Sequence, residues 1–294
     1  MRLIHILLAL LVAAIWGFNF VVIRVGIDAM PPLMFSALRF LFAAIPLVFF
    51  VPRPQVPWPL LLAIGFILGV VKFGLLFVGM HVGLSAGLAS LVLQSQAFFT
   101  VILASVILGE RPRSMQIIGI LVAFCGVALV ALTVDADVTI TGLLLVISAA
   151  FAWSLSNLLM KKAAGANMLH LMIWISLIPP LPLLALSALF EGGGNDLTAL
   201  LQLDWKAIGA VAYIAYGATI IGFAIWGRLI AIYGAGRIAP FSLLVPIFGM
   251  GSSALFLGEE FGSLRLLAAL LVIFGLVLTV LRFPHKKVQQ RGQS

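Results

Sequence analysis

Leu108-Gly109-Glu110 ends one apolar stretch of the chain, and Leu257-Gly258-Glu259 ends another. The two copies lie 149 residues apart. A second correspondence, at an offset of 138 residues, pairs Asn19 with Asn157. Matched segments at nearly constant offsets indicate that the chain is an internal duplication, with the two halves meeting near its middle.

The composition indicates that a bilayer, and not water, surrounds most of the chain. Hydrophobic residues make up 64% of the 294 residues, and charged residues make up 9%, whereas a soluble domain carries about 25% charged residues. In lipid every backbone polar group must be satisfied internally, so only helices or a closed barrel can span. The uninterrupted apolar run over residues 3–23 favours helices, because barrel strands are short and alternate.

Each half contains about five apolar segments of the length that a bilayer requires. A unit with an odd number of spans, repeated in tandem, inserts its second copy in the opposite direction. We therefore predict an all-α integral membrane protein with ten transmembrane helices, arranged as two inverted five-helix repeats over residues 1–134 and 138–283. A disordered polar tail is expected over residues 284–294. The predicted helices span residues 3–24, 33–51, 59–80, 85–108, 115–133, 139–160, 169–190, 207–227, 238–257 and 264–282. Inverted repeats with a site between them are typical of secondary transporters.

The distribution of Lys and Arg predicts the orientation, because cytoplasmic loops carry an excess of both residues. If the N-terminus is cytoplasmic, twelve basic residues lie on the cytoplasmic side and four on the other. The twelve are Arg2, Arg53, Arg111, Arg113, Lys161, Lys162, Arg228, Arg237, Arg282, Lys286, Lys287 and Arg291, and the four are Arg24, Arg39, Lys206 and Arg265. We expect both termini in the cytoplasm.

Lys72 lies inside the third predicted helix, about 18 Å along it. A lysine near the bilayer centre costs roughly 2.5–3.5 kcal/mol on insertion scales. Lys72 either extends its amine to the interface or faces a hydrated cavity and attracts a carboxylate of the substrate. The second interpretation is favoured, because ionisable groups inside the membrane are functional candidates.

The matched Asn19 and Asn157 lie close in sequence to Trp16 and Trp153. An amide can bind an amino-acid-like ligand, or it can join two helices at about 0.6–2 kcal/mol per hydrogen bond. Both interpretations are open. The corresponding positions in the two repeats place the pair near the symmetry axis, where a midplane site forms.

The fourth predicted helix contains Gln94 and Gln96, which are about 200° apart on an α-helix. We expect at most one of them to face a cavity and the other to bond a neighbouring helix.

The eighth predicted helix places Tyr216, Thr219, Phe223 and Trp226 on one face. An aromatic stripe more often packs against helices or lies at the interface, but Tyr216 is deep enough to be a candidate binding residue.

Several classes of function find no support in the sequence. No Asp or Glu lies within a predicted span core, and there is no phosphate-binding Gly-rich loop, metal-ligand cluster or nucleophile–base pair. We expect no catalytic residue, metal or cofactor, and no enzyme activity. The net charge of +8 reflects membrane topology more than nucleic-acid binding, because the basic residues lie at span ends.

The segment Trp16-Gly17-Phe18-Asn19-Phe20 and the segment Leu38-Arg39-Phe40 resemble the start of an EamA-type unit of the drug/metabolite transporter superfamily. Further matching segments are Gly87-Leu88-Ala89-Ser90-Leu91-Val92-Leu93-Gln94, Gly109-Glu110-Arg111, Ala239-Pro240, Ser242-Leu243-Leu244-Val245-Pro246 and Gly258-Glu259. The resemblance covers nearly the whole chain and is greatest to bacterial exporters of cysteine, O-acetylserine and related amino acids.

The resemblance implies ten helices in two inverted repeats, a multi-pass location in the bacterial inner membrane, and export of small metabolites through a central cavity. The expected partners are a small-molecule substrate and membrane lipid, with the protein a monomer or a homodimer. A channel, a scaffold or an enzyme acting on lipid-soluble substrates is the alternative.

Overall fold

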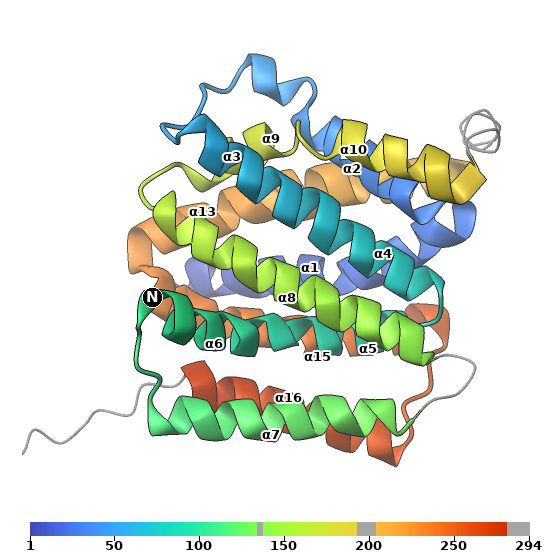
Figure 1. The fold of residues 1–294 in the computed structure, drawn as a ribbon, viewed down its shortest axis with the longest axis vertical. Helices are drawn as coiled ribbons and strands as arrows, with labels where there is room; N and C mark the ends of the chain where they lie inside the picture. The colour runs from blue at the N-terminus through green and yellow to red at the C-terminus, as the bar shows by residue number, and fades with distance from the viewer. Residues whose placement is uncertain (134–137, 193–203, 281–294) are drawn as a thin grey trace, which may run out of the picture.

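A computed structural model describes residues 1–133, 138–192 and 204–280, and helices form nearly all of its regular structure. The long helices run roughly parallel or antiparallel to one another (Figure 1). The first half contains α1 (Leu3–Ala29), α2 (Pro32–Ala44), η1 (Leu47–Phe49), α3 (Trp58–Ile64), η2 (Gly65–Lys72), α4 (Phe73–His81), α5 (Ala86–Val92), η3 (Leu93–Ser95), α6 (Gln96–Leu108) and α7 (Ser114–Ala131).

The second half has the same general order of helices. It contains α8 (Ile140–Lys162), α9 (Met168–Ile175), α10 (Pro180–Ser187), η4 (Ala188–Gly192), α12 (Trp205–Ala212), η5 (Tyr213–Ile221), α13 (Gly222–Tyr233), α14 (Ala235–Ile238), η6 (Ala239–Leu244), α15 (Val245–Leu257) and α16 (Ser263–Val280). The tail predicted to be disordered, residues 284–294, lies outside the described residues.

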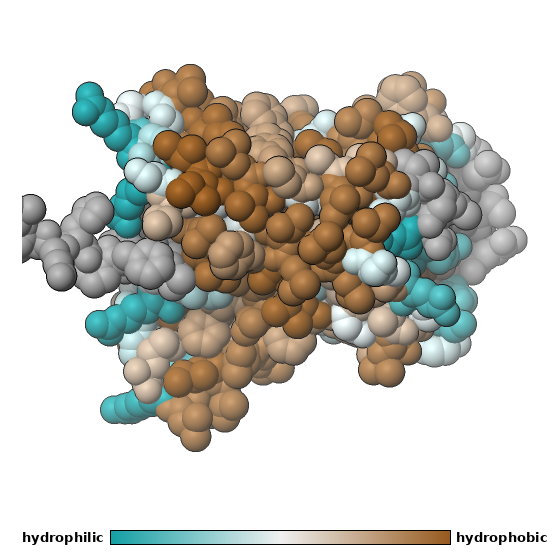
Figure 2. Space-filling view, turned by 90° about the horizontal axis from the view of Figure 1, so that it is seen from below, coloured by the Kyte–Doolittle hydropathy of each residue, from teal (hydrophilic) through white to brown (hydrophobic). Residues whose placement is uncertain are grey.

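The helices are long and apolar enough for a multi-pass membrane protein. Nine helical segments of the described residues have at least 18 residues and the hydropathy of a membrane span, and Ser263–Thr279 forms a shorter apolar helix. An apolar belt crosses the middle of the surface, and hydrophilic residues gather at both ends (Figure 2). The prediction of an all-helical membrane protein with about ten helices is confirmed at this level.

The two copies of Leu-Gly-Glu end their helices with the same backbone geometry. Gly109 and Gly258 adopt φ angles of 67° and 68°, in the left-handed region that favours glycine. In each copy the following glutamate N–H donates to the carbonyl oxygen six residues earlier, at 3.3 Å. Such bonds satisfy carbonyl groups that the helix end leaves free. The repeated sequence therefore forms a repeated backbone.

Two pairs of interruptions recur at matched places, and the sequence indicated a break only in the ninth span, at Pro240 and Pro246. Stretches of π-helix, η2 and η5, begin 148 residues apart and end 149 residues apart. The 3-10 helices η3 and η6 overlap at the same offset. Pro240 lies in η6, and Pro246 lies at the start of α15. Each proline lacks the backbone N–H that continues the hydrogen bonds of a helix, which favours a break there. A π-helix adds one residue to a turn and shifts which side chains share a face.

The last helix of each half packs against the other, and this pair lies at one end of the body (Figure 1). The contact is close because glycines face each other: a Cβ on Gly119 would meet the carbonyl oxygen of Gly275, and the reverse also holds. Small residues let membrane helices approach. The helices α7 and α16 pair with each other. Other spans of both halves pack around α1.

Candidate functional site

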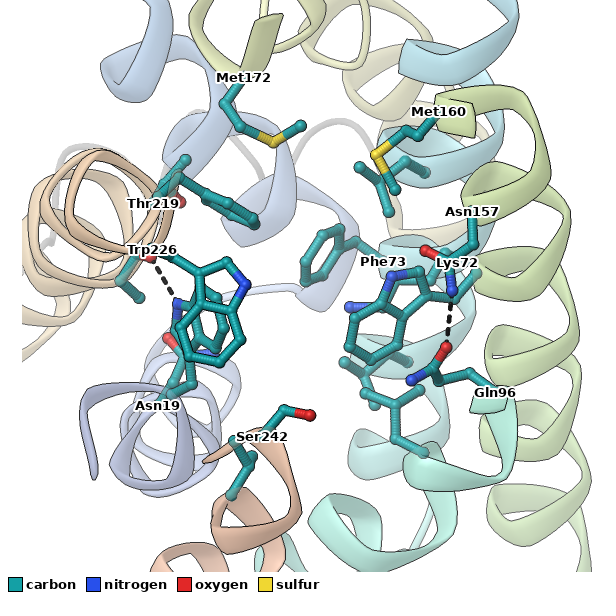
Figure 3. Close-up of a pocket in the computed structure, with 18 of the residues that line it drawn as sticks. Asn19, Lys72, Phe73, Gln96, Asn157, Met160, Met172, Thr219, Trp226 and Ser242 are labelled. Carbon is teal, nitrogen blue, oxygen red and sulfur yellow. Dashed lines mark hydrogen bonds between the residues drawn. The ribbon is translucent and has the colours of Figure 1, made fainter. Parts of the chain in front are cut away.

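A cavity of about 410 Å³ lies among the middle parts of the spans. Its lining comes from both halves (Figure 3). The first half contributes selected residues between Trp16 and Gln96, and the second half contributes selected residues between Trp153 and Val245. Its volume falls within the roughly 300–1,000 Å³ that small-molecule sites usually occupy. Both halves of the duplication therefore build one cavity.

The cavity opens toward the end of the molecule that carries the N-terminus. Its lining reaches Ala235 and Ala239, which are both exposed. A hydrogen bond of 2.6 Å joins Tyr233, two residues before Ala235, to His5 near the start of the chain. At the opposite end Met34 and Met80 are fully buried in the main apolar core. The structure is thus open on one side and closed on the other.

At the closed end, the carboxylates of two glutamates accept hydrogen bonds from the starts of neighbouring helices. Glu259, from the second half, accepts hydrogen bonds from the backbone N–H groups of Ala86 at 2.7 Å and Gly87 at 3.0 Å. Glu191 accepts from the N–H of Leu33 at 2.9 Å. Carboxylates are favourable at helix N-termini, where N–H groups lack partners within the helix. Two acids of the second half thus hold helices of the first half.

Lys72 lies in the cavity wall at the end of the π-helix η2, and only 3% of its surface is exposed. Its Nζ lies 3.2 Å from the centre of the Phe73 ring and 4.6 Å from that of Trp153. No hydrogen bond or ion pair connects the amine to any residue of the described ranges. The geometry agrees with the cavity interpretation of Lys72, and not with an amine that extends to the interface.

Arg39 also lines the cavity, which sequence reasoning missed. The orientation count assigned this residue to the outer side, and that assignment is wrong: Arg39 lies within α2 and is 3% exposed. Its Cζ lies 3.8 Å from the centre of the Phe73 ring and 4.2 Å from that of Phe40. Its position six residues inside the predicted helix 33–51 could have indicated a buried charge.

The two matched asparagines play different parts in this structure. Asn157 Nδ2 donates to Gln96 Oε1 at 2.7 Å and to Thr100 Oγ1 at 3.2 Å (Figure 3). Asn19 lines the cavity, and its buried Oδ1 has no hydrogen-bond partner among the described residues. Asn157 therefore joins α8 to α6, whereas the buried side-chain oxygen of Asn19 has no such partner among the described residues.

Gln94 and Gln96 both line the cavity, so the expectation that at most one would do so is wrong. The 3-10 helix Leu93–Ser95 changes the angle between the two side chains to about 240°, or 120° measured the other way. Gln94 Nε2 donates to the carbonyl oxygen of Ser242 at 3.2 Å. The two amides therefore lie on the cavity wall and contact the second half from there.

The aromatic wall includes Trp16 and Trp153, as expected, together with Phe223 and Trp226. Trp16 packs against Phe223 and Trp226, with ring centres 5.2 Å and 5.0 Å apart. Tyr216 does not line the cavity and is 39% exposed, so its assignment as a binding residue is wrong. The π-helix η5 explains the error, because its extra residue per turn separates the face of Tyr216 from that of Thr219, Phe223 and Trp226.

The chemistry of the site is that of binding. No group of three or more His, Cys, Asp or Glu residues that could hold a metal occurs among the described residues. The cavity wall combines two buried cations, four side-chain amides and aromatic rings. Such a wall can hold a small charged solute that enters from the open side.

Comparison with known proteins decides the family. A family model described as the EamA-like transporter family matches residues 3–132 and again residues 140–281. The chain belongs to the EamA-like transporter family. The two matches cover both halves of the duplication, and membership identifies a multi-pass membrane transporter and not an enzyme.

Similar proteins agree with this membership, and a solved structure has a similar fold. The chain is 41% identical over 97% of its length to a "Probable amino-acid metabolite efflux pump" of Escherichia coli (strain K12), and it covers 97% of that protein. It is 42% identical to a protein of the same description from Salmonella typhimurium (strain LT2), covering 95% and 96% of the two chains. An "Uncharacterized inner membrane transporter YedA" of Escherichia coli is 26% identical, with 93% and 90% covered. A crystal structure matches the fold with a TM-score of 0.63 at 16% identity, covering 95% of this chain and 98% of that one.

Proposed function

We propose that this EamA-like transporter exports amino-acid metabolites across the bacterial inner membrane by alternating access of the central cavity. The observation that carries the proposal is the cavity itself. Side chains of both halves line it near the middle of their spans, and it is open at one end and closed at the other. Secondary transporters place their substrate in this way, at the interface of two repeats.

The relatives support the substrate class. Two proteins that share 41% and 42% of their residues with this chain carry the description of amino-acid metabolite efflux pumps. The cavity offers matching chemistry, since Lys72 can attract a carboxylate and side-chain amides of the wall can form hydrogen bonds with the solute. Gln94, Gln96, Asn157, Trp16 and Trp153 complete the proposed binding wall.

Export requires a defined orientation in the membrane. We assign ten spans in two inverted repeats, residues 1–134 and 138–283, with both termini in the cytoplasm and the open end of the cavity facing inward. Without Arg39, the outer side of the basic-residue count holds three residues against twelve, which strengthens this orientation. An export-dependent phosphatase fused after Ser294 should be inactive, and activity there would overturn the orientation.

Transport by the purified protein tests the proposal directly. The full chain is reconstituted into liposomes that contain an unlabelled amino-acid metabolite, and entry of the labelled compound by exchange is measured. The test set includes O-acetylserine, cysteine, and neutral and acidic amino acids. We expect saturable exchange of at least one member that protein-free liposomes lack. Equal uptake by loaded, unloaded and protein-free liposomes for every compound would refute the proposal.

A further inference from the structure

Arg39 and Lys72 lie on the same aromatic ring. The Arg39 Cζ is 3.8 Å from the centre of the Phe73 ring, and the Lys72 Nζ is 3.2 Å from it. Both side chains are 3% exposed, and both line the cavity. Two cations from neighbouring spans are therefore held close together inside the membrane.

Nothing in the described part of the chain neutralises these cations. The described acids lie at helix ends: Asp28, Glu110, Glu191, Asp204, Glu259 and Glu260. No Asp or Glu is among the residues that line the described cavity. The buried Nε of Arg39 has no hydrogen-bond partner, and no hydrogen bond from Lys72 to another described residue occurs. The cations therefore lack the acceptors that buried charges require.

Aromatic rings explain how the cations are tolerated, but not why they are present. The faces of Phe40, Phe73 and Trp153 attract a cation through the ring quadrupole. A ring carries no net charge, so it cannot cancel the repulsion between a guanidinium and an amine in a low-dielectric site. An anion that contacts both groups would offset that repulsion and supply the missing acceptors.

We infer that the cavity selects amino-acid metabolites with a net negative charge, and that dicarboxylic amino acids are the favoured class. This inference rests on the proposed function and specifies its substrate. One carboxylate meets the planar donors of Arg39, which suit a bidentate contact, and the other meets Lys72. The rest of the molecule, including its ammonium group, occupies the remainder of the cavity of about 410 Å³.

Exchange of aspartate against asparagine tests the inference, because the two compounds have nearly the same size and differ by one charge. In liposomes that contain the wild-type protein, aspartate should exchange about tenfold faster than asparagine, since a neutral amide leaves one cation without its charge-assisted bond. Arg39→Gln and Lys72→Gln should each reduce aspartate exchange more than asparagine exchange, so that the ratio approaches one.

Two further variants control for folding and for general charge loss. Arg39→Lys keeps the charge and should keep much of the ratio. Arg24→Gln removes an exposed cation that pairs with Asp28 at 3.1 Å, away from the cavity, and should leave the ratio unchanged. A wild-type ratio near one, or a ratio unaffected by both Arg39→Gln and Lys72→Gln, would overturn the inference.

A melting assay in detergent separates failure of this inference from failure of the proposed function. Exchange of neutral compounds with no exchange of aspartate keeps the proposed function and overturns the anion preference. If no compound exchanges but aspartate, and not asparagine, raises Tm, the anion site stands and the transport proposal fails. If neither exchange nor a Tm shift occurs, both are wrong.

Discussion

The two Leu-Gly-Glu helix ends have the same backbone but different side-chain partners. Glu259 is partly buried and accepts two backbone hydrogen bonds at the start of α5, in the other half of the chain. Glu110 is exposed and instead pairs with Lys161 at 3.2 Å. Within the part of the chain that the structure describes, no side chain bonds the first N–H groups of α14, the helix that corresponds to α5. At the closed end of the cavity, the glutamate of the duplicated motif therefore binds the start of a helix from the other half. At the open end, the corresponding Glu110 forms a surface ion pair instead.

The cavity shows the same contrast between the halves. The first half supplies Arg39, Lys72 and two glutamines, whereas the residues that match Gln94 and Gln96 are Leu243 and Val245. The second half contributes mainly the aromatic and apolar wall. Duplication thus supplies the shared enclosure, while divergence of one copy supplies most of the polar chemistry. The following variants test this division of roles.

The largest effect is expected at Lys72, which ends the π-helix of the first half. Lys72→Met keeps the bulk, removes the charge, and should reduce exchange of carboxylate substrates about tenfold or more, the value of one lost charge-assisted bond. Expression should stay near normal, because an apolar residue is inexpensive in lipid. Ile221→Met changes the matched end of η5, where the side chain is 50% exposed, and should leave exchange unchanged.

Lys72→Arg refines this comparison. It should restore part of the activity, because a guanidinium keeps the charge but differs in shape. Wild-type exchange by Lys72→Met would show that the lysine does not bind substrate and would remove the main chemical difference between the halves.

The second-largest effect is expected at the glutamates of the two Leu-Gly-Glu motifs, Glu259 and Glu110. A cysteine in place of Ile23, one turn beyond Asn19 toward the closed end, is introduced in a Cys125→Ala background. Adding Glu259→Gln should increase its labelling by an impermeant thiol reagent from outside about fivefold, because the amide makes weaker bonds to the N–H groups of α5. Glu110→Gln should change labelling less than about twofold, since exposed ion pairs contribute little. Equal effects of the two variants would contradict the asymmetry.

Substitution of the two matched asparagines should affect different properties: thermal stability for Asn157 and transport for Asn19. Asn157→Ala removes hydrogen bonds to Gln96 and Thr100 and should lower Tm by about 2–4 °C. Asn19→Ala removes a carbonyl oxygen without a described partner, so Tm should stay within about 1 °C while exchange falls. Thermal unfolding in detergent and exchange in liposomes measure the two properties. Equal loss of Tm in both variants would mean that the asparagines act alike.

The smallest effect is expected at Gln94. Gln94→Leu gives the first half the residue that the second half has at Leu243, and it removes the bond of 3.2 Å to the carbonyl oxygen of Ser242. Hydrogen bonds between membrane helices average about 0.6 kcal/mol, so exchange and Tm should change only slightly. A loss as large as that of Lys72→Met would mean that Gln94 contributes as much to substrate binding as Lys72 does.

Much of the architecture follows from the sequence alone. Apolar segments of bilayer length, the scarcity of charge and the repeated Leu-Gly-Glu indicate a duplicated helical membrane protein. The same sequence identifies Lys72, Asn19, Trp16 and Trp153 as candidates for one site. The inferences about architecture succeed because helix length, insertion cost and duplication are properties of local composition.

The tertiary structure alone decided which candidate residues line the cavity and which of them also join helices. It placed Arg39 and Lys72 on one ring although 33 positions separate them, and it gave Asn157 partners that the matched Asn19 lacks. It also turned Tyr216 outward and brought both glutamines to the cavity, through π and 3-10 turns that the sequence did not predict. These outcomes depend on contacts between distant segments and on small shifts in helix register, and a periodic sequence pattern contains neither.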